Sequence, residues 1–177
     1  MDFAKANPGQ LRWANPGQGS LHTLSGMIFL DGNGIEAQGI PFSGGSKTRN
    51  AVAGGQVDFG FMGISLLAGF GGELRALGVT DDVRDPIYPD VPTFGEQGLP
   101  QMGISAPLVL WGPKDLPEDI SNALVDAIAQ AAQSKGYNSL IVKAGLTGVY
   151  STPEETMAMV RALDETVTPI IMELFGK

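Results

Sequence analysis

The strongest constraint on the fold is a regular alternation of strand-like and helix-like segments between residues 11 and 80, with glycine at almost every change. Short runs of apolar, β-branched or aromatic residues predict strands at 11–14, 36–41, 57–62 and 74–79. The intervening patterns predict helices at 20–30, 46–53 and 64–68. Strands and helices that alternate in this way form parallel sheets with right-handed crossovers. We therefore expect an α/β fold.

The alternation stops after residue 80. Residues 81–101 are rich in proline and turn formers, which indicates a linker or a wrapping loop, and the apolar run 104–111 fits a strand better than a helix. Helices are then predicted at 117–134, 137–144 and 153–177. The last begins with a capping box formed by Thr152 and Glu155, and Pro169 is expected to kink it. A compact α/β unit is thus followed by a helical tail.

Two glycine-rich loops, residues 15–20 and 43–46, each lie between a predicted strand and a predicted helix and end in a serine. A third turn, Met62-Gly63, follows the third strand. A helix N-terminus presents unpaired N–H groups and about half a positive charge, and glycine lets a ligand approach the backbone closely. In an open parallel sheet such loops meet at the carboxyl ends of the strands. They are candidate anion sites, although tight turns and N-caps alone would also explain these residues.

Composition and spacing restrict the other possible chemistries. A net charge of −8 argues against nucleic acid as a partner. The absence of cysteine and the single histidine exclude thiolate and histidine-rich metal sites and iron–sulfur clusters, and we expect neither a metal nor a cofactor. Neither loop is a nucleotide-binding motif. His22 lies two residues from Ser20, a spacing that points the two side chains apart on a helix and argues against a Ser-His hydrolase. His22 is therefore either a structural residue of the first helical turn or a contact to an anionic ligand.

The first nine residues have no export-signal pattern, in which basic residues precede an apolar run. They are typical instead of the last turns of a helix stopped by Asn7-Pro8-Gly9, which suggests that an upstream segment has been removed. No apolar run reaches the length of a membrane span.

From the two glycine loops outward, the sequence resembles the extracytoplasmic solute receptors of tripartite tricarboxylate transporters, the Bug or TctC-type binding proteins. The segments that carry the resemblance are 4–11, 16–22, 41–45, 53–58, 74–80, 89–93, 98–100 and 151–155. The resemblance implies a periplasmic-binding-protein-like lobe, a non-enzymatic role and a periplasmic location. It further implies a small organic anion as ligand, a di- or tricarboxylate or an aromatic acid, and membrane permease subunits as partners.

On this mapping, residues 1–102 resemble the second, ligand-binding lobe, residues 103–113 the crossing strand or hinge, and residues 114–177 the helices that pack on a first lobe. That first lobe is missing from the chain. The ligand-facing positions implied by the resemblance are Gly17, Gly19, Ser20, His22, Gly44, Gly45, Ser46 and Gly63. Family members usually carry an acidic or amide residue after the third strand, where this chain has Met62-Gly63, which implies a less polar ligand on that side.

Two interpretations of the function stay open. The chain is a solute-binding receptor, whole or in part, or it is a stand-alone carboxylate sensor or oligomeric interaction module derived from one. The apolar faces of residues 117–134 and 153–175 have no evident sheet of their own to cover, which predicts a homodimer through the C-terminal helices.

Overall fold

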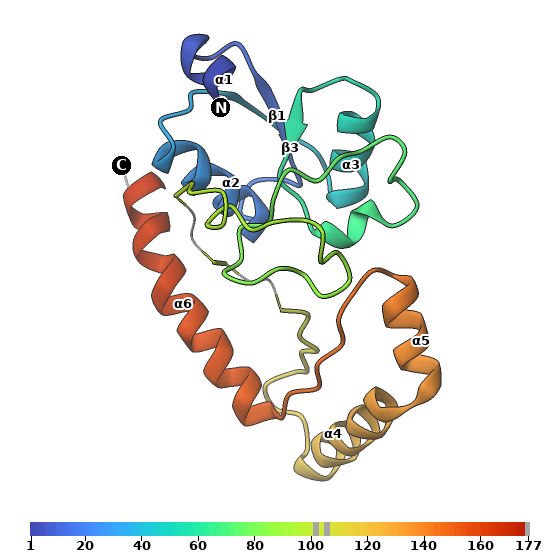
Figure 1. The fold of residues 1–177 in the computed structure, drawn as a ribbon. Coiled ribbons are helices and arrows are strands. Elements are labelled where there is room, and N and C mark those ends of the chain that lie inside the picture. Colours follow the sequence, from blue (N-terminus) through green and yellow to red (C-terminus); the bar gives the residue numbers. More distant parts are fainter. Residues whose placement is uncertain (101–102, 105–106, 176–177) are drawn as a thin grey trace. The chain divides into compact units, whose positions relative to one another are not determined.

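The computed structural model describes residues 1–100, 103–104 and 107–175 (Figure 1). It divides into two compact units. Unit 1 comprises Met1–Ala106 and Lys143–Thr147, and unit 2 comprises Pro107–Val142 and Gly148–Lys177. The assignment of 1–102, 103–113 and 114–177 to the lobe, hinge and tail of a receptor stays a prediction.

Unit 1 is built on a three-stranded parallel sheet, as the alternating pattern predicted. Its strands are β1 (Arg12–Asn15), β2 (Gln38–Pro41) and β3 (Phe59–Gly60), in the order β2-β1-β3. In the central strand Trp13 pairs with Gly39 on one side and with Phe59 on the other. β3 is only two residues long, although its neighbours also bond to β1: the Asp58 N–H donates to the Arg12 carbonyl at 2.9 Å and the Phe61 N–H to the Ala14 carbonyl at 3.1 Å.

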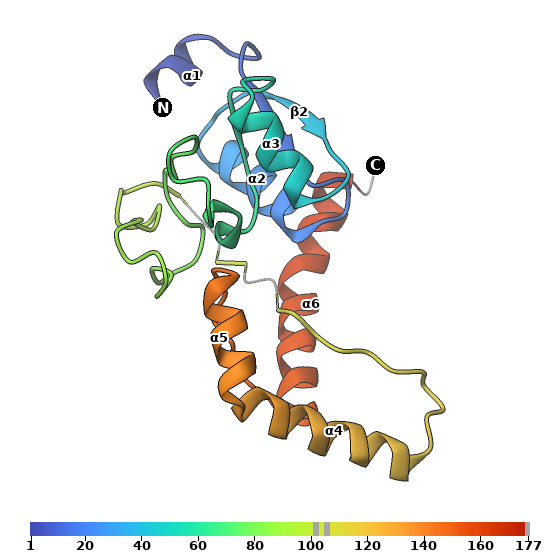
Figure 2. The ribbon, with the colours of Figure 1, turned by 90° about the vertical axis from the view of Figure 1, so that its right-hand side faces the viewer.

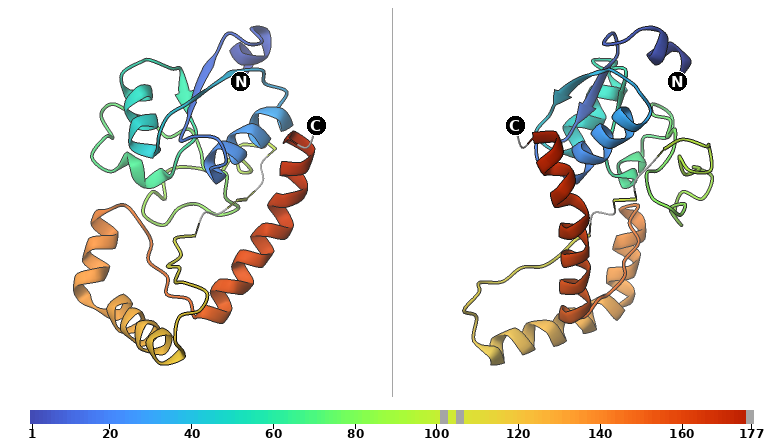
Figure 3. Two further views of the ribbon diagram at one scale, coloured as in Figure 1. Left: turned by 180° about the vertical axis from the view of Figure 1, so that it is seen from behind. Right: turned by 90° about the vertical axis from the view of Figure 1, so that its left-hand side faces the viewer.

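The helices of unit 1 are α1 (Asp2–Ala6), α2 (Leu21–Gly32), α3 (Gly45–Ala53) and the 3₁₀ helix η1 (Ile64–Leu67). Two of them, α2 and α3, cover opposite faces of the sheet. Successive side chains of a strand point to opposite faces, so the pair Trp13 and Ala14 separates the core into two clusters. Trp13 packs with Phe29 and Leu30 of α2, whereas Ala14 packs with Ala51 of α3 and with Val57. Figure 2 looks onto the α3 side of the sheet, and the right panel of Figure 3 looks onto the α2 side.

The α2 side is held by aromatic contacts that leave no room at one helical glycine. The rings of Trp13 and Phe61 meet edge to face at 5.7 Å, and those of Phe29 and Phe94 lie 4.2 Å apart. A Cβ on Gly26 would lie 2.7 Å from a Trp13 ring carbon and 2.8 Å from a Phe61 ring carbon. Glycine at this position therefore lets α2 approach the sheet closely.

The fourth strand predicted at 74–79 is not formed, and this prediction was wrong. A single parallel bridge joins Val79 to Thr93, with the Val79 carbonyl accepting a 2.9 Å hydrogen bond from the Phe94 N–H. The segment has the apolar composition of a buried strand, but a ladder also requires a neighbouring strand edge with free N–H and C=O groups. Here Val79 meets an irregular loop.

The strand predicted at 104–111 is also absent from the described part of that segment, while Ser105 and Ala106 lie outside the described residues. Leu108, Leu110 and Trp111 are all exposed, so the apolar run is not buried between sheet neighbours.

The proline-rich segment is ordered by a polar cluster centred on Glu96. Arg84 Nε donates to both Glu96 carboxylate oxygens, at 3.0 and 2.9 Å, and Arg84 Nη1 donates to the Pro89 carbonyl at 2.8 Å. Glu96 and Thr93 form a reciprocal capping box, with N–H to side-chain distances of 2.8 and 3.0 Å. The hydrogen bond from Arg84 lowers the pKa of Glu96 below its ordinary value.

Unit 2 consists of extended segments and helices at the predicted places: α4 (Glu118–Gln133), α5 (Lys135–Lys143) and α6 (Pro153–Phe175). The predicted capping box at the start of α6 is confirmed, because Glu155 accepts from the Thr152 N–H at 2.8 Å and donates its own N–H to the Thr152 hydroxyl at 3.2 Å. α6 is one continuous helix with Pro169 inside it, and the kink expected at Pro169 stays a prediction. None of the described helices is long and apolar enough to cross a membrane.

Candidate functional site

Three loops leave the carboxyl ends of the three parallel strands and converge at one edge of the sheet. The first loop is residues 16–20 after β1, the second is residues 42–44 after β2, and the third is residues 61–63 after β3. The first two lead directly into α2 and α3, and the third into η1. This is the edge at which open α/β sheets bind small ligands.

The first and second loops contact each other through backbone groups. The Gly44 N–H donates to the Pro16 carbonyl at 3.3 Å, and the Phe42 N–H donates to the Asn15 carbonyl at 2.8 Å. A Cβ on Gly17 would lie 3.5 Å from the Phe42 carbonyl oxygen. The prediction that the two glycine loops lie side by side is therefore confirmed.

The first loop is held by a buried polar cluster that the sequence analysis missed. The Thr23 hydroxyl lies 2.7 Å from the Gly17 carbonyl, 2.9 Å from the Ser20 hydroxyl and 3.3 Å from Asn15 Oδ1. Asn15 Oδ1 also accepts the Gly17 N–H at 3.1 Å. Asn15 and Thr23 are 5% and 7% exposed, so the cluster is shielded from water. Its only sequence signal is a threonine three residues after an N-cap serine, a pattern common to many helices.

Ser20 is the N-cap of α2, as predicted, and its hydroxyl accepts the Thr23 N–H at 3.1 Å. Gly17 and Gly19 have φ angles of 117° and 81°, in the left-handed region that favours glycine. These two glycines let the chain reverse between β1 and α2 within a few residues.

The second loop differs from the prediction in its start point. α3 begins at Gly45, not at Ser46, and its N-cap is Gly44, with φ 98°. The reason is that Thr48, which is fully buried, closes the first turn by donating from its hydroxyl to the Gly44 carbonyl at 3.1 Å. Ser46 is exposed in the first turn and contributes no cap.

Not every glycine of the two loops offers a free donor. The N–H groups of Gly17 and Gly44 are already bonded, to Asn15 Oδ1 and to the Pro16 and Phe42 carbonyls. The first positions of a helix have no intrahelical acceptor. Within the described chain, the N–H groups without an acceptor in these loops and first turns include those of Gly19, Leu21, His22, Gly45, Ser46 and Lys47. Two helix N-termini thus present unpaired donors.

The third loop contributes its glycine to a contact with His22. A Cβ on Gly63 would lie 3.4 Å from His22 Nε2, so the imidazole lies directly over this turn. His22 is half-buried, and burial lowers the pKa of its imidazole below the ordinary value. The neutral ring therefore predominates at neutral pH.

Two basic side chains follow the second loop. Lys47 Nζ donates to the Ser43 hydroxyl at 2.9 Å, which places an ammonium group beside the loop. The Arg49 guanidinium stacks on the Phe70 ring at 3.7 Å from its centroid. Among the described residues, no group of three or more His, Cys, Asp or Glu side chains is placed to hold a metal ion.

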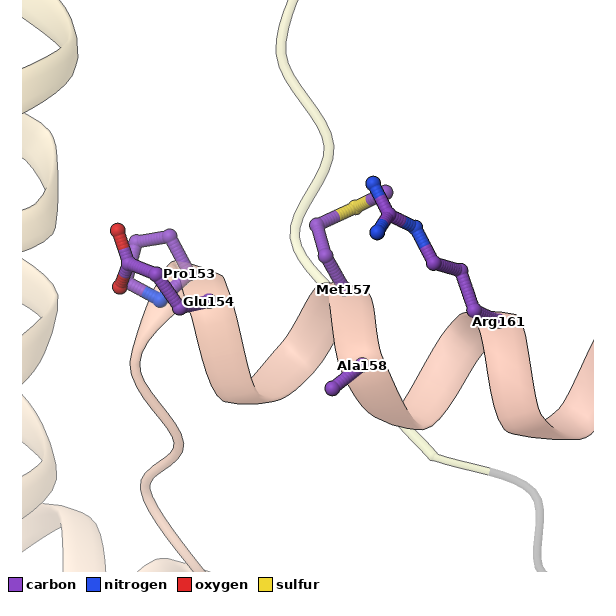
Figure 4. A pocket seen from close by; sticks show the side chains of 5 residues that line it. All are labelled: Pro153, Glu154, Met157, Ala158 and Arg161. Carbon is purple, nitrogen blue, oxygen red and sulfur yellow. The ribbon is translucent and has the colours of Figure 1, made fainter.

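A shallow hollow elsewhere does not compete with this site. It lies on the first turns of α6 in unit 2 and is lined by Pro153, Glu154, Met157, Ala158 and Arg161 (Figure 4). Figure 4 shows Met157 and Arg161 together at one end and Pro153 with Glu154 at the other. All five residues come from one helix, so the hollow has no second wall.

Comparison with known sequences places the whole chain in one family. The model of the tripartite tricarboxylate transporter family receptor matches residues 1–175. A UPF0065 protein from the tcbD-tcbE intergenic region of Pseudomonas sp. (strain P51) is 28% identical over 180 residues, covering 98% of this chain and 52% of that protein. A UPF0065 protein of Agrobacterium vitis is 29% identical over 131 residues, covering 73% of this chain and 38% of that protein. The chain thus spans about half the length, or less, of these curated relatives.

Solved structures show the same fold. Rpa4515 of R. palustris, solved with adipate, superimposes with a TM-score of 0.86 at 22% identity, covering 96% of this chain and 57% of that one. MatC from Rhodopseudomonas palustris, with bound malate, gives a TM-score of 0.75 at 25% identity, covering 96% and 58%. The periplasmic binding protein BugD gives 0.79 at 21%, covering 97% and 59%. The family match over nearly the full chain, with this shared fold, shows that the protein belongs to the tripartite tricarboxylate transporter receptor family.

Proposed function

We propose that the chain is a periplasmic solute-binding receptor, or the part of one that carries this lobe, and that it binds a small carboxylate at the first and second loops. The observation that carries the proposal is the pairing of two helix N-termini at one edge of the sheet, joined by the 3.3 Å hydrogen bond from the Gly44 N–H to the Pro16 carbonyl. Unpaired N–H groups and two aligned helix dipoles favour an anion there.

The ligand class is supported by the relatives. Adipate and malate, bound by two structural neighbours, are both short dicarboxylates. In this chain one carboxylate would accept hydrogen bonds from the free N–H groups of Gly19 and Gly45 and of the first turns that follow them. The net charge of −8 repels an anion, and the ammonium group of Lys47 beside the second loop would offset this repulsion at the site.

A transport receptor must bind its solute reversibly, and the chemistry of the site is suited to this. The site offers peptide N–H donors and a neutral imidazole, and the Ser20 hydroxyl is engaged with Thr23 rather than with His22. Such a site captures and releases an anion without covalent chemistry, which fits handover of the solute to a membrane permease. The alternative role, a carboxylate sensor or interaction module, is favoured by the exposed apolar side chains of unit 2.

The test is a titration of the ¹⁵N-labelled chain with adipate and malate, followed through the backbone amide signals. We expect the Gly19, Gly45 and Ser46 amides to shift together and saturably, whereas the uncharged diamide of adipic acid leaves them unchanged. Gly44→Ala should abolish the shifts because alanine cannot adopt φ 98° without strain.

Gly34→Ala is the matched control. Gly34 also has a positive φ, 64°, and no atom lies within 4 Å of the Cβ position, but it follows the far end of α2. A φ of 64° is reached by alanine at a lower cost than the φ 98° and ψ 163° of Gly44, so Gly34→Ala should lose less stability and retain the amide shifts. If neither acid moves the loop amides, or if the diamide moves them equally, carboxylate binding at this site is refuted.

A further inference from the structure

A short segment from late in the chain lies against the residues that follow the third loop. Lys143–Thr147 belongs to unit 1, although the residues on either side of it in the sequence belong to unit 2. Gly145, at its centre, is buried and has a φ of 70°. A Cβ on Gly145 would lie 2.8 Å from the Tyr88 hydroxyl oxygen and 3.2 Å from the Ser65 carbonyl oxygen. We call Lys143–Thr147 the clip.

The end of α5 explains only part of what Gly145 does. A left-handed φ is common where a helix ends, and glycine or asparagine usually supplies it. The two close approaches are a separate requirement, because they leave no room for a side chain. Tyr88 is held in place from its own loop, where its N–H donates to Asp85 Oδ1 at 3.2 Å, and Ser65 lies within η1. The clip is therefore packed between two ordered segments of unit 1.

The other contacts of this turn are with the candidate site. Gly63, which precedes η1, lies beneath the imidazole of His22, since a Cβ on Gly63 would be 3.4 Å from Nε2. Leu66, the residue after Ser65, covers the start of α3, since a Cβ on Gly45 would be 2.7 Å from a Leu66 methyl carbon. The Gly63 carbonyl accepts the Leu66 N–H at 3.1 Å, which joins the two contacts in a single turn.

This turn connects the clip to both helix N-termini. Ser65 carries the clip contact and lies between Gly63 and Leu66, which carry the contacts to the first turns of α2 and α3. A closely packed interior transmits displacements between neighbouring groups, and energetic coupling follows such chains of contacts. A displacement of Ser65 would therefore move the two residues that border the free N–H donors of the site.

We propose that the clip positions the carboxylate-binding loops: by holding Ser65, it fixes Gly63 beneath His22 and Leu66 against Gly45. Gly145 is then a positioning residue of the site, although it comes from a distant part of the sequence. This inference rests on the proposed carboxylate site, and it adds to that site a third support besides α2 and α3.

Gly145→Asn tests the clip with little backbone strain, because asparagine adopts the left-handed region more readily than most residues. Its side chain does not fit between Tyr88 and Ser65, so the clip must move away from η1. Gly98→Asn is the matched control. Gly98 lies in the same unit and has the same φ of 70°, but no atom lies within 4 Å of an added Cβ.

The first readout needs no ligand and uses the ¹⁵N-labelled chain. We expect Gly145→Asn to move the Gly45 and Gly63 amide signals and to raise the pKa of His22 toward its ordinary value of 6.5, because the imidazole loses the turn that covers it. Gly98→Asn should leave the two signals and this pKa as they are in wild type. The proposal is overturned if Gly145→Asn also leaves them unchanged.

The second readout is the amide titration with adipate, compared through the initial slope of the shifts. Gly145→Asn should weaken binding by about fivefold, the lower end of coupling between separate sites, whereas Gly98→Asn should keep the wild-type affinity. Because coupling is reciprocal, adipate should also shift the Gly145 amide of wild type. Wild-type affinity in Gly145→Asn overturns the proposal. If wild type itself binds no acid, the carboxylate site fails, and the ligand-free readout still decides whether the clip holds the loops.

Discussion

Thr23→Val removes the hydroxyl that fixes the first loop while keeping a β-branched side chain. The hydroxyl donates to the Gly17 carbonyl at 2.7 Å in an environment where Thr23 is only 7% exposed. A buried acceptor that loses its donor costs about 1–3 kcal/mol. The Gly17 carbonyl keeps a weaker 3.3 Å bond from the Ser20 N–H, which places the expected loss at about 1–2 kcal/mol. A methyl group would also lie too close to the Ser20 hydroxyl, so the first loop must shift.

Thermal unfolding and the amide titration measure the two consequences. For a chain of 177 residues the loss corresponds to a fall in Tm of about 2–8 °C. The same variant should weaken carboxylate binding because the first loop no longer holds its donors in place. Thr23→Ser retains the hydroxyl and should stay closer to wild type in both respects. If Thr23→Val matches wild type in Tm and in binding, the buried cluster does not position the loop.

Three further predictions concern the packing and charges of unit 1. Gly26→Ala should lower the free energy of unfolding in urea by about 1–2 kcal/mol, because overpacking against two aromatic rings outweighs the gain in helix propensity. The control is Gly136→Ala, where no atom lies within 4 Å of the added Cβ, and it should be neutral or stabilising. The pKa of His22, measured by NMR, should lie below 6.5. Just below pH 6.5 the unfolded chain then binds more protons than the folded chain, so the free energy of unfolding decreases as the pH falls through this range. His22→Gln should remove the part of this pH dependence that comes from the imidazole. The pKa of Glu96 is lowered, so its ion pair stabilises the fold fully above the ordinary glutamate pKa of 4.5, and this stabilisation is lost as the pH falls below that value through the folded pKa. Arg84→Met should therefore lower the Tm at pH 7 and lower it less in acid, where only the hydrogen bond to the Pro89 carbonyl is still at stake.

The parts of the fold that follow from short-range physics were predictable from the sequence. The Ser20 cap of α2 and the Thr152–Glu155 capping box depend on residues within one helical turn, and both are formed. The parallel sheet follows from the alternation of strands and helices, and with it the meeting of the glycine loops at one edge.

The parts that were not predictable depend on partners distant in the sequence. Leu74–Val79 has the composition of a strand, but within the described residues Val79 pairs only with Thr93. The start of α3 was misplaced by one residue because Thr48, whose burial is a tertiary property, closes the first turn onto Gly44. The donors of the site were likewise hidden, since only the structure shows that the Gly17 and Gly44 N–H groups are already bonded.

The exposure of the site sets a limit on the affinity of this chain. Gly19 and Ser46 are exposed, and Gly45 and His22 are half-buried, so a carboxylate at their N–H groups would remain in contact with water. Hydrogen bonds to a charged group contribute about 1.5–3 kcal/mol each, and contact with water favours the lower end, so four of them give about 6 kcal/mol. The entropic cost of association, about 4 kcal/mol or more, leaves about 2 kcal/mol or less. We therefore predict millimolar or weaker binding in the amide titration. A micromolar dissociation constant corresponds to about 8 kcal/mol, roughly 6 kcal/mol more than the loops supply, and would indicate that a second surface closes over the ligand.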